Sequence, residues 1–264
     1  MSWSTSIPPR SALLACWATA WLASEASLPE LVARVTAYDD AHTVSGLWVD
    51  DLELEQAVGR LRADGVTRLR LVLPAPGDPL GLPGPGAFTA AALVAGEGVL
   101  ALRPDGSGTG LVPGLTSHGS ELDGTVTTVI WAAHHVEVTG PDQGPFLHEA
   151  EHDLRLGVVE AVRALTDLDV ARWNPDIGDA LHDLRRSARK GIDEDELPGS
   201  WPPRARQVLV QARALGGVLQ LATQDQGGAF DSRETEARDR VLRELARVVR
   251  RARVAAYNAH GSAP

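Results

Sequence analysis

The feature that most constrains the fold is a change in hydrophobic periodicity at Thr139–Pro145, which has the sequence Thr-Gly-Pro-Asp-Gln-Gly-Pro. Before this stretch, segments with helical spacing alternate with segments of strand-like spacing, whereas every later apolar pattern has the helical period. With 264 residues, 44% of them hydrophobic, the chain can bury one large core or two modest ones. We therefore predict two domains, at residues 1–140 and 146–264.

The first domain is predicted to be α+β with a small antiparallel sheet of three to five strands. Helices are expected at residues 11–23, where Leu13, Trp17 and Trp21 share one stripe, after the capping box that begins at Ser27, and from Asp50 or Asp51 to Ala63. Alternating or β-branched residues predict strands at 66–73, 99–102, 111–112 and 125–138. Residues 88–94 fit either a helix or a strand.

The second domain is predicted to be a four-helix bundle. Its helices are expected at about residues 146–168, from Asn174 with Pro175 at the first helical position, from after Pro203 to near Gly227, and from Asp231 to about Asn258. The loops between these helices are short, as is usual for antiparallel neighbours in a bundle.

Composition excludes several classes of protein. The only lysine, Lys190, precedes Gly191, which excludes a P-loop, and the only cysteine, Cys16, excludes an intramolecular disulfide and a cysteine zinc cluster. The net charge of -10 argues against nucleic acid as a partner. No apolar run approaches the ~20 residues that span a bilayer, so we expect no membrane partner. The stripe on the first helix favours a cytoplasmic amphipathic helix over a signal peptide.

One stretch has the pattern of catalytic machinery. His148-Glu149-Ala150-Glu151-His152 fits H-E-x-x-H, which places two imidazoles one helical turn apart beside a carboxylate. The apolar stripe of this helix starts at Leu154, and both histidines lie about 120° from its centre, toward the polar side. Two hypotheses follow: a solvated first turn, which we favour, or a zinc site with His148, His152 and His182 as ligands and Glu149 as general base.

Arginines gather on one side of the last helix, residues 233–258. They are Arg240, Arg243, Arg247, Arg250, Arg251 and Arg253, and an apolar stripe runs opposite them. A solvated face paired in part with Glu234, Glu236 and Glu244 is the interpretation we favour. The alternative is contact with an anionic ligand, and among such ligands we prefer a protein, with self-association also open.

Three short phrases resemble an uncharacterised actinobacterial protein family with no known activity. They are Gly110-Leu111-Val112-Pro113, Asp169-Val170-Ala171-Arg172-Trp173 and Val254-Ala255-Ala256-Tyr257-Asn258. The resemblance implies a bacterial cytoplasmic protein and transfers no site residue. We expect a non-enzymatic interaction or accessory protein that binds a protein partner through helical faces and needs no cofactor. A zinc-dependent hydrolase that uses His148–His152 is the alternative.

Overall fold

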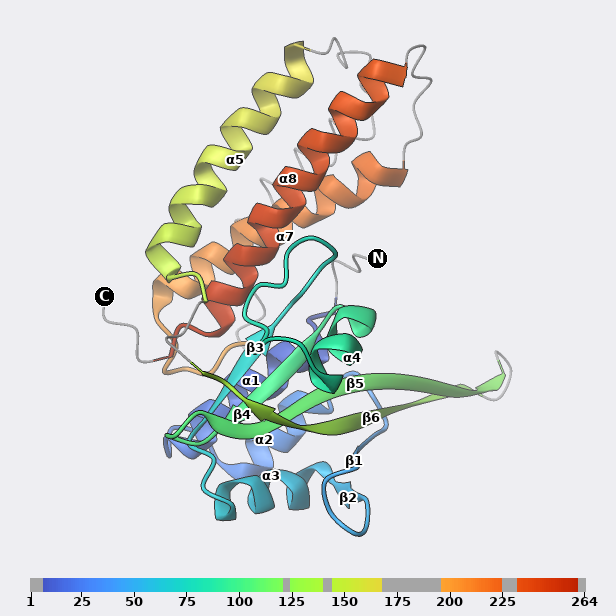
Figure 1. The fold of residues 1–264 in the computed structure, drawn as a ribbon, viewed down its shortest axis with the longest axis vertical. Helices are drawn as coiled ribbons and strands as arrows, with labels where there is room; N and C mark the ends of the chain where they lie inside the picture. Colours follow the sequence, from blue (N-terminus) through green and yellow to red (C-terminus); the bar gives the residue numbers. More distant parts are fainter. Residues whose placement is uncertain (1–6, 121–123, 140–143, 168–195, 225–231, 261–264) are drawn as a thin grey trace. The chain divides into compact units, whose positions relative to one another are not determined.

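The structure is a computed structural model that describes residues 7–120, 124–139, 144–167, 196–224 and 232–260 (Figure 1). The described residues fall into two compact units. The N-terminal unit comprises mainly residues 7–139 with 196–201, and the C-terminal unit comprises residues 145–167, 202–224 and 232–260. The domain boundaries predicted from sequence, 1–140 and 146–264, stay a prediction.

A six-stranded sheet forms the centre of the N-terminal unit, in the order β2-β1-β6-β5-β4-β3. The strands are β1 (Ala41–Ser45), β2 (Leu52–Glu53), β3 (Arg68–Val72), β4 (Gly98–Leu102), β5 (Ser107–Ser120) and β6 (Gly124–Glu137). β1 pairs with β6 in parallel, and the other described pairs are antiparallel. The α+β class is confirmed, but the prediction of a small antiparallel sheet is wrong. The β1–β6 pairing joins residues far apart in sequence, which local patterns do not encode.

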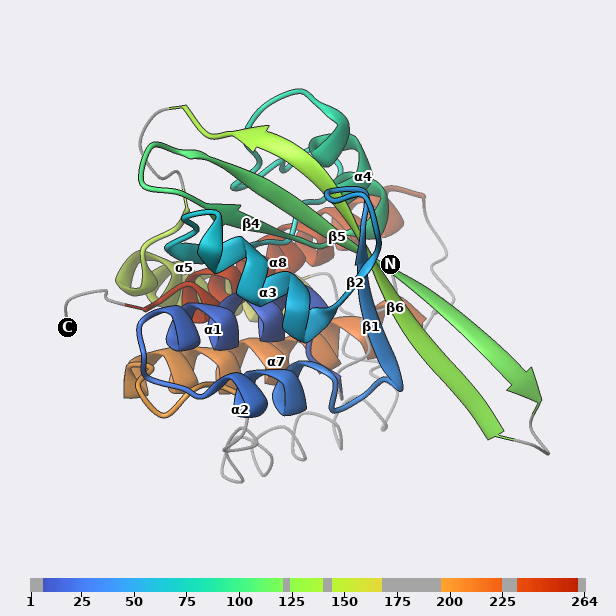
Figure 2. The ribbon, with the colours of Figure 1, turned by 90° about the horizontal axis from the view of Figure 1, so that it is seen from below.

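Helices cover both faces of this sheet. α1 (Arg10–Leu22), α2 (Leu28–Val35) and α3 (Leu54–Ala63) lie on one face, and α4 (Ala87–Ala95) lies on the other (Figures 1 and 2). The ambiguous residues 88–94 are therefore helical. The capping box of α2 is confirmed, because Ser27 accepts a hydrogen bond from the Glu30 N–H and Glu30 accepts one from the Ser27 N–H.

Two local predictions for these helices are wrong. Glu53, and not Asp50 or Asp51, precedes α3, and it makes no side-chain capping bond. α1 is not amphipathic, because every residue from Ser11 to Ala20 is buried. Thr19 meets this burial by accepting a hydrogen bond from the Leu69 N–H and donating one to the Leu69 carbonyl of β3. Burial on all sides removes the polar face that the sequence pattern predicted.

The core on the α4 face is centred on Phe88. Its ring lies over Gly110 of β5, where a Cβ atom would approach Phe88 Cδ2 to 2.2 Å. The surrounding buried side chains are Val72, Ala92, Leu100, Leu102, Val112 and Val136. The missing side chain at Gly110 therefore lets α4 pack closely on the sheet.

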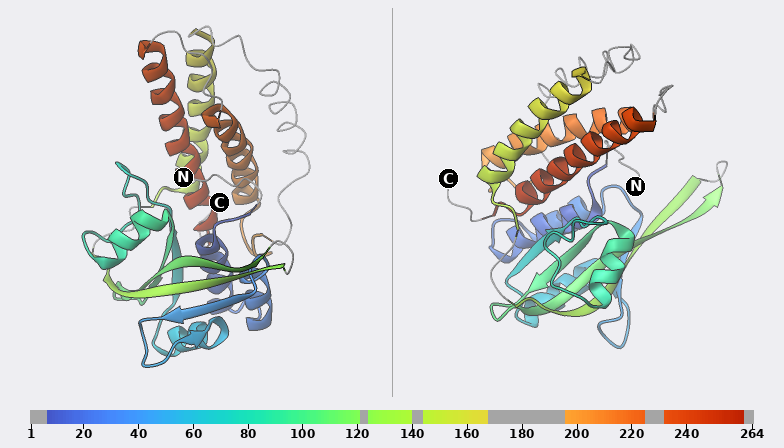
Figure 3. Two further views of the ribbon diagram at one scale, coloured as in Figure 1. Left: turned by 90° about the vertical axis from the view of Figure 1, so that its right-hand side faces the viewer. Right: turned by 45° about the horizontal axis from the view of Figure 1, so that its top comes forward.

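Three helices form the described part of the C-terminal unit: α5 (Leu147–Asp167), α7 (Pro203–Gln224) and α8 (Ser232–Tyr257) (Figure 3). α8 packs against both α5 and α7. A Cβ at Gly157 of α5 would lie 3.3 Å from Val248 of α8, so these two helices approach closely there. The helix predicted from Asn174 falls outside the described residues, and the four-helix bundle stays a prediction.

No helix in the described part of the chain combines the length and the apolar composition needed to cross a bilayer.

Candidate functional site

The histidine pair of the H-E-x-x-H stretch lies at the start of α5 on its exposed side. His148, Glu149 and His152 are exposed, whereas Ala150 and Leu154 are buried. A helix turns by about 100° per residue, so the two imidazoles share one face and Ala150 and Leu154 share the opposite one. The imidazoles therefore point away from the side of α5 that is packed.

The other groups around this stretch bind one another. Glu151 forms an ion pair with Arg155 at 3.2 Å and a second with Arg204 of α7. The ring of His148 stacks on Phe146, with 6.0 Å between the ring centroids. No three His, Cys, Asp or Glu side chains gather as metal ligands within the described ranges. His182, the third ligand proposed from sequence, lies outside those ranges, so the zinc site stays a hypothesis.

Exposed apolar side chains continue the face that carries the two histidines. Leu156 and Val159 are 49% and 65% exposed. At helical spacing, His148, His152, Leu156 and Val159 fall within a sector of about 80°. We call these four residues, with Phe146 just before the helix, the α5 outer stripe. Because it combines aromatic, imidazole and aliphatic groups, the stripe offers a surface suited to a protein rather than to a small charged ligand.

The arginines of α8 do not form one continuous cationic face. Arg240 and Arg243 are exposed, but Arg250 is only 7% exposed. Arg247 donates hydrogen bonds to both carboxylate oxygens of Glu244, at 3.0 and 3.1 Å. In the C-terminal half of this helix Arg250 is buried and Arg247, Arg251 and Arg253 are only partly exposed, so the predicted exposed arginine face does not continue there. The partial pairing with Glu244 agrees with the favoured interpretation.

A buried chain of polar side chains links the start of α1 to the sheet in the N-terminal unit. Arg10 donates two hydrogen bonds to the Asp39 carboxylate, at 3.0 and 2.8 Å. Nε2 of His42 lies 3.2 Å from the same carboxylate, and Nε1 of Trp131 lies 3.2 Å from His42 Nδ1. The side chains of Asp39 and His42 are fully buried. Arg10, Asp39, His42 and Trp131 are called the buried network below.

Charge and burial set the protonation of the buried network. Burial lowers the pKa of His42, against the opposing effect of Asp39. Burial by itself would raise the pKa of Asp39, but the hydrogen bonds and charge of Arg10, with the hydrogen bond from His42, hold that pKa below its usual value. The hydrogen bond to Asp39 raises the pKa of Arg10. At neutral pH the network is thus an ion pair beside a neutral imidazole.

The tautomer of His42 decides what this network can do. An indole N–H only donates, so Nδ1 of His42 is the acceptor and the single ring proton lies on Nε2, directed at Asp39. Both ring nitrogens are thereby occupied, and neither can abstract a proton from a substrate. Although Asp39 and His42 resemble two members of a catalytic triad, their geometry serves to hold α1, β1 and β6 together.

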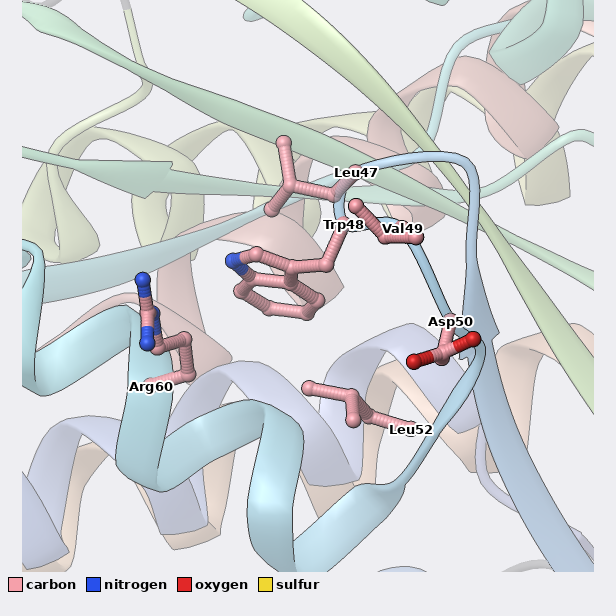
Figure 4. A pocket seen from close by; sticks show the side chains of 6 residues that line it. All are labelled: Leu47, Trp48, Val49, Asp50, Leu52 and Arg60. Atoms are coloured by element: carbon pink, nitrogen blue, oxygen red, sulfur yellow. The ribbon is translucent and has the colours of Figure 1, made fainter.

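A surface hollow of about 670 Å³ lies between α3 and the loop after β1. Leu47, Trp48, Val49, Asp50, Leu52 and Arg60 line it, and the Trp48 indole faces the space between Arg60 and Leu52 (Figure 4). Arg60 also contacts Asp64 at 3.5 Å. The hollow offers an indole face and a cation, but it holds no arranged set of acid, base or nucleophile.

The buried network could not be found from sequence. Arg10 lies 29 residues from Asp39, and His42 lies 89 residues from Trp131. The only local signal is an Asp followed three residues later by a His, and that spacing is common. The position of the half-buried Trp48 beside the hollow likewise has no sequence signal, since tryptophan most often marks a packed position.

The fold and these sites define an α+β protein with a helical C-terminal unit. Within the described residues, no acid, base and nucleophile are arranged together as in an active site. The chain belongs to the Rv1486c-like protein family. Residues 11–145 match the model of its N-terminal domain, and residues 148–254 match the model of its C-terminal domain.

Relatives of similar length occur in mycobacteria. The uncharacterized protein Rv1486c of Mycobacterium tuberculosis is 30% identical, over 94% of this chain and 96% of its own length. The uncharacterized protein ML1804 of Mycobacterium leprae is 31% identical with the same coverage, and the uncharacterized protein MAV321 of Mycobacterium avium is 28% identical. No solved structure matches the chain. The family is thus the uncharacterised actinobacterial one that the sequence resembles, and it carries no known activity.

Proposed function

We propose that the protein is a cytoplasmic, non-enzymatic interaction protein that binds a protein partner through exposed faces of its C-terminal helices. The observation that carries the proposal is the α5 outer stripe. The proposal includes completion of the C-terminal unit as a four-helix bundle, which would fix α5 in place and leave this face outward.

The stripe has the composition of a binding surface. Full burial of a Leu or Val side chain contributes about 1.5–3 kcal/mol, so covering these half-exposed residues would contribute about 1 kcal/mol each. The stacked Phe146 and His148 rings add a rigid aromatic edge, a type of group enriched at interfaces. A few such anchors at the centre of a contact commonly dominate its affinity.

The buried network supports the non-enzymatic part of the proposal. His42 is held between an acid and a second polar group, and both of its nitrogens are committed. Glu151, the second of the two carboxylates in the H-E-x-x-H stretch, is engaged by two arginines, while Glu149, the general base of the zinc hypothesis, is exposed. These contacts stabilise the fold and leave neither His42 nor Glu151 available for acid–base catalysis.

Comparative affinity purification tests the proposal. The full chain, tagged and expressed in a mycobacterium, is purified as the unaltered protein, as Val159→Asp and as Val94→Asp. Val94 of α4 is 91% exposed and lies in the other unit, so it is a matched control for adding a carboxylate at an exposed valine.

The expected result is a protein retained by the unaltered chain and by Val94→Asp but lost with Val159→Asp. Titration of that protein, once purified, should give a Kd at least tenfold weaker for Val159→Asp. Equal recovery of every protein with all three chains would contradict the proposal.

A further inference from the structure

β5 and β6 continue beyond the rest of the sheet as a two-stranded arm. β4 pairs with β5 only up to Leu111, whereas β5 and β6 pair with each other as far as Ser120 and Gly124. The arm is defined as residues 112–120 of β5 with their partners 124–132 of β6. No helix covers its far part, which projects from the N-terminal unit (Figure 2). Sequence patterns predicted the β6 half of the arm, within the strand expected at 125–138, but on β5 they predicted a strand only at residues 111–112.

The two edges of the arm differ. Asp40 covers the β6 edge, because its carboxylate accepts a hydrogen bond from the Thr127 N–H at 2.6 Å and its own N–H donates to the Thr127 carbonyl at 2.8 Å. Nearer the sheet, β1 pairs with residues 128–132 of β6. The β5 edge beyond Leu111 has no strand beside it in the described part of the chain.

Two hydrogen bonds show which backbone groups face this open edge. The carbonyl of Ser107 accepts a hydrogen bond from the Arg103 N–H. The backbone N–H and C=O groups of the odd-numbered residues of β5 are therefore directed toward the β4 side of the strand. The backbone N–H and C=O groups of Thr127 bond to Asp40 and are therefore directed away from β5. Because Ser117 lies opposite Thr127, its backbone N–H and C=O groups are directed away from β6. Both observations place the N–H and C=O groups of Leu115, Ser117 and Gly119 on the open edge. Pro113 has no N–H to offer, and pairing with β4 ends just before it.

The arm also lacks the charges that usually protect an edge strand. Residues 107–120 and 124–136 contain no Asp, Glu, Lys or Arg, in a chain whose net charge is -10. Natural proteins commonly place such charges on exposed edges to prevent strand pairing. Leu115, at 50% exposure, lies on this edge instead.

We propose that the open β5 edge pairs with the same edge of a second copy of this chain, antiparallel about a twofold axis at Ser117. In this register Ser117 lies opposite its own equivalent, and Leu115 of each copy lies opposite Gly119 of the other. All three positions have both an N–H and a C=O group, so up to six backbone hydrogen bonds join the copies. The six-stranded sheet of one copy is then continuous with that of the other.

A second copy fits this strip better than a charged partner does. An isologous contact needs a surface that is complementary to itself, and Leu115, Ser117 and Gly119 are spaced symmetrically about the axis. Two chains of charge -10 repel each other, and an uncharged strip adds no like charges at the contact. A partner recognised by charge would need acidic or basic side chains on the strip, which its sequence lacks.

Sedimentation of the full chain over a range of concentrations measures the pairing. We expect a mass near twice 28.0 kDa that falls toward 28.0 kDa on dilution. Ser117→Pro removes an N–H that does not bond to β6, and should weaken dimerisation at least tenfold, whereas Ser117→Ala should leave it within about threefold. A monomer at every concentration, or equal dimerisation of Ser117→Pro and the unaltered chain, would overturn the proposal.

Ser117→Pro could also weaken dimerisation by distorting the β5–β6 hairpin, so a second pair of variants tests the edge without proline. Leu115→Lys places a cation on the open edge and should also weaken dimerisation at least tenfold. Val126→Lys adds the same charge at an equally exposed position on β6 and should not. Equal weakening by both lysines would show that the β5 edge is not the contact.

A cross-linking experiment tests the register directly. The only native cysteine, Cys16, is buried. Directly opposed residues in a hydrogen-bonded pair have Cα atoms about 5.5 Å apart, within the ~4.4–6.8 Å range of disulfides. Ser117→Cys should therefore give a covalent dimer under mild oxidation. Val126→Cys should not, since its two copies would lie about 14 Å apart across three strand spacings. Equal cross-linking of the two variants would refute the twofold register.

This inference uses the N-terminal unit and does not depend on the α5 outer stripe. Val159→Asp should leave the dimer intact, and Ser117→Pro should leave the partner binding of α5 in place. Failure of either idea is thus separable from failure of the other.

Discussion

Replacing Asp39 with asparagine tests the buried network most directly. The substitution keeps the shape of the side chain but removes the negative charge of the carboxylate. That carboxylate accepts two hydrogen bonds from Arg10 and one from His42. Breaking a buried ion pair by removing one partner costs about 3–5 kcal/mol. The Arg10 side chain keeps 18% exposure, so water offsets part of this loss. We expect the free energy of unfolding to fall by about 2–4 kcal/mol.

Urea denaturation of the full chain, followed by far-UV circular dichroism, measures this loss. Asp50→Asn is the matched control, because Asp50 is exposed and its substitution should change stability by less than about 0.5 kcal/mol. In a double-mutant cycle with Arg10→Met, the two losses should sum to more than the loss of the double variant, by about 1–3 kcal/mol. A loss below about 0.5 kcal/mol for Asp39→Asn, or strict additivity in the cycle, would refute the structural role of the network.

The same network predicts how stability depends on pH. The pKa of His42 is lower in the folded chain than the usual 6.5, so the unfolded chain binds more protons as pH falls below 6.5. The pKa of Asp39 is also lowered, from 3.8, and acts in the same direction at more acidic pH. The contribution of His42 should be complete above pH 6.5 and diminish below it. Urea midpoints that do not change between pH 7.5 and 5.0 would contradict the assignment of His42 as a buried neutral imidazole.

Two further predictions concern packing and metal binding. Gly110→Ala should destabilise the chain by about 1–3 kcal/mol, because its Cβ would overlap the Phe88 ring. Gly59→Ala, in open space within α3, should instead stabilise the chain by about 0.5–1 kcal/mol. Thermal unfolding measures both changes, and equal shifts of the melting temperature would argue against the packing of α4 on the sheet. Elemental analysis of the purified chain should find no stoichiometric zinc, since His148 and His152 are exposed. Zinc that is present at one equivalent and lost in His152→Ala would contradict this expectation and favour the hydrolase alternative.

The long hairpin shows where local patterns stop predicting structure. The β-branched run at 125–138 predicted β6 almost to the residue, because such side chains favour strands whatever their partner. β5 contains Gly108, Gly110, Gly114 and Gly119. Because glycine is unfavourable in strands, the sequence pattern did not predict most of β5. Its extended backbone is imposed by pairing with β6, which a local sequence window does not contain.

The zinc hypothesis shows the same limit for a site. The sequence located both histidines on one face of a helix, because helical spacing alone determines this. Whether a third ligand approaches them depends on packing between segments far apart in sequence. The favoured interpretation of a solvated first turn rested on the apolar stripe of the same helix, and the structure places both imidazoles in exposed positions.

The sequence by itself determined the α+β class, the capping box at Ser27, the positions of most helices and the membership of a family with mycobacterial members. These features depend on short-range periodicity, local hydrogen bonds or residue identity. Only the tertiary structure decided the parallel β1–β6 pairing, the complete burial of α1, the buried network around His42 and the open edge of β5. Each of these arises from contacts between residues that are distant along the chain. Local sequence patterns do not encode the free energy of such contacts.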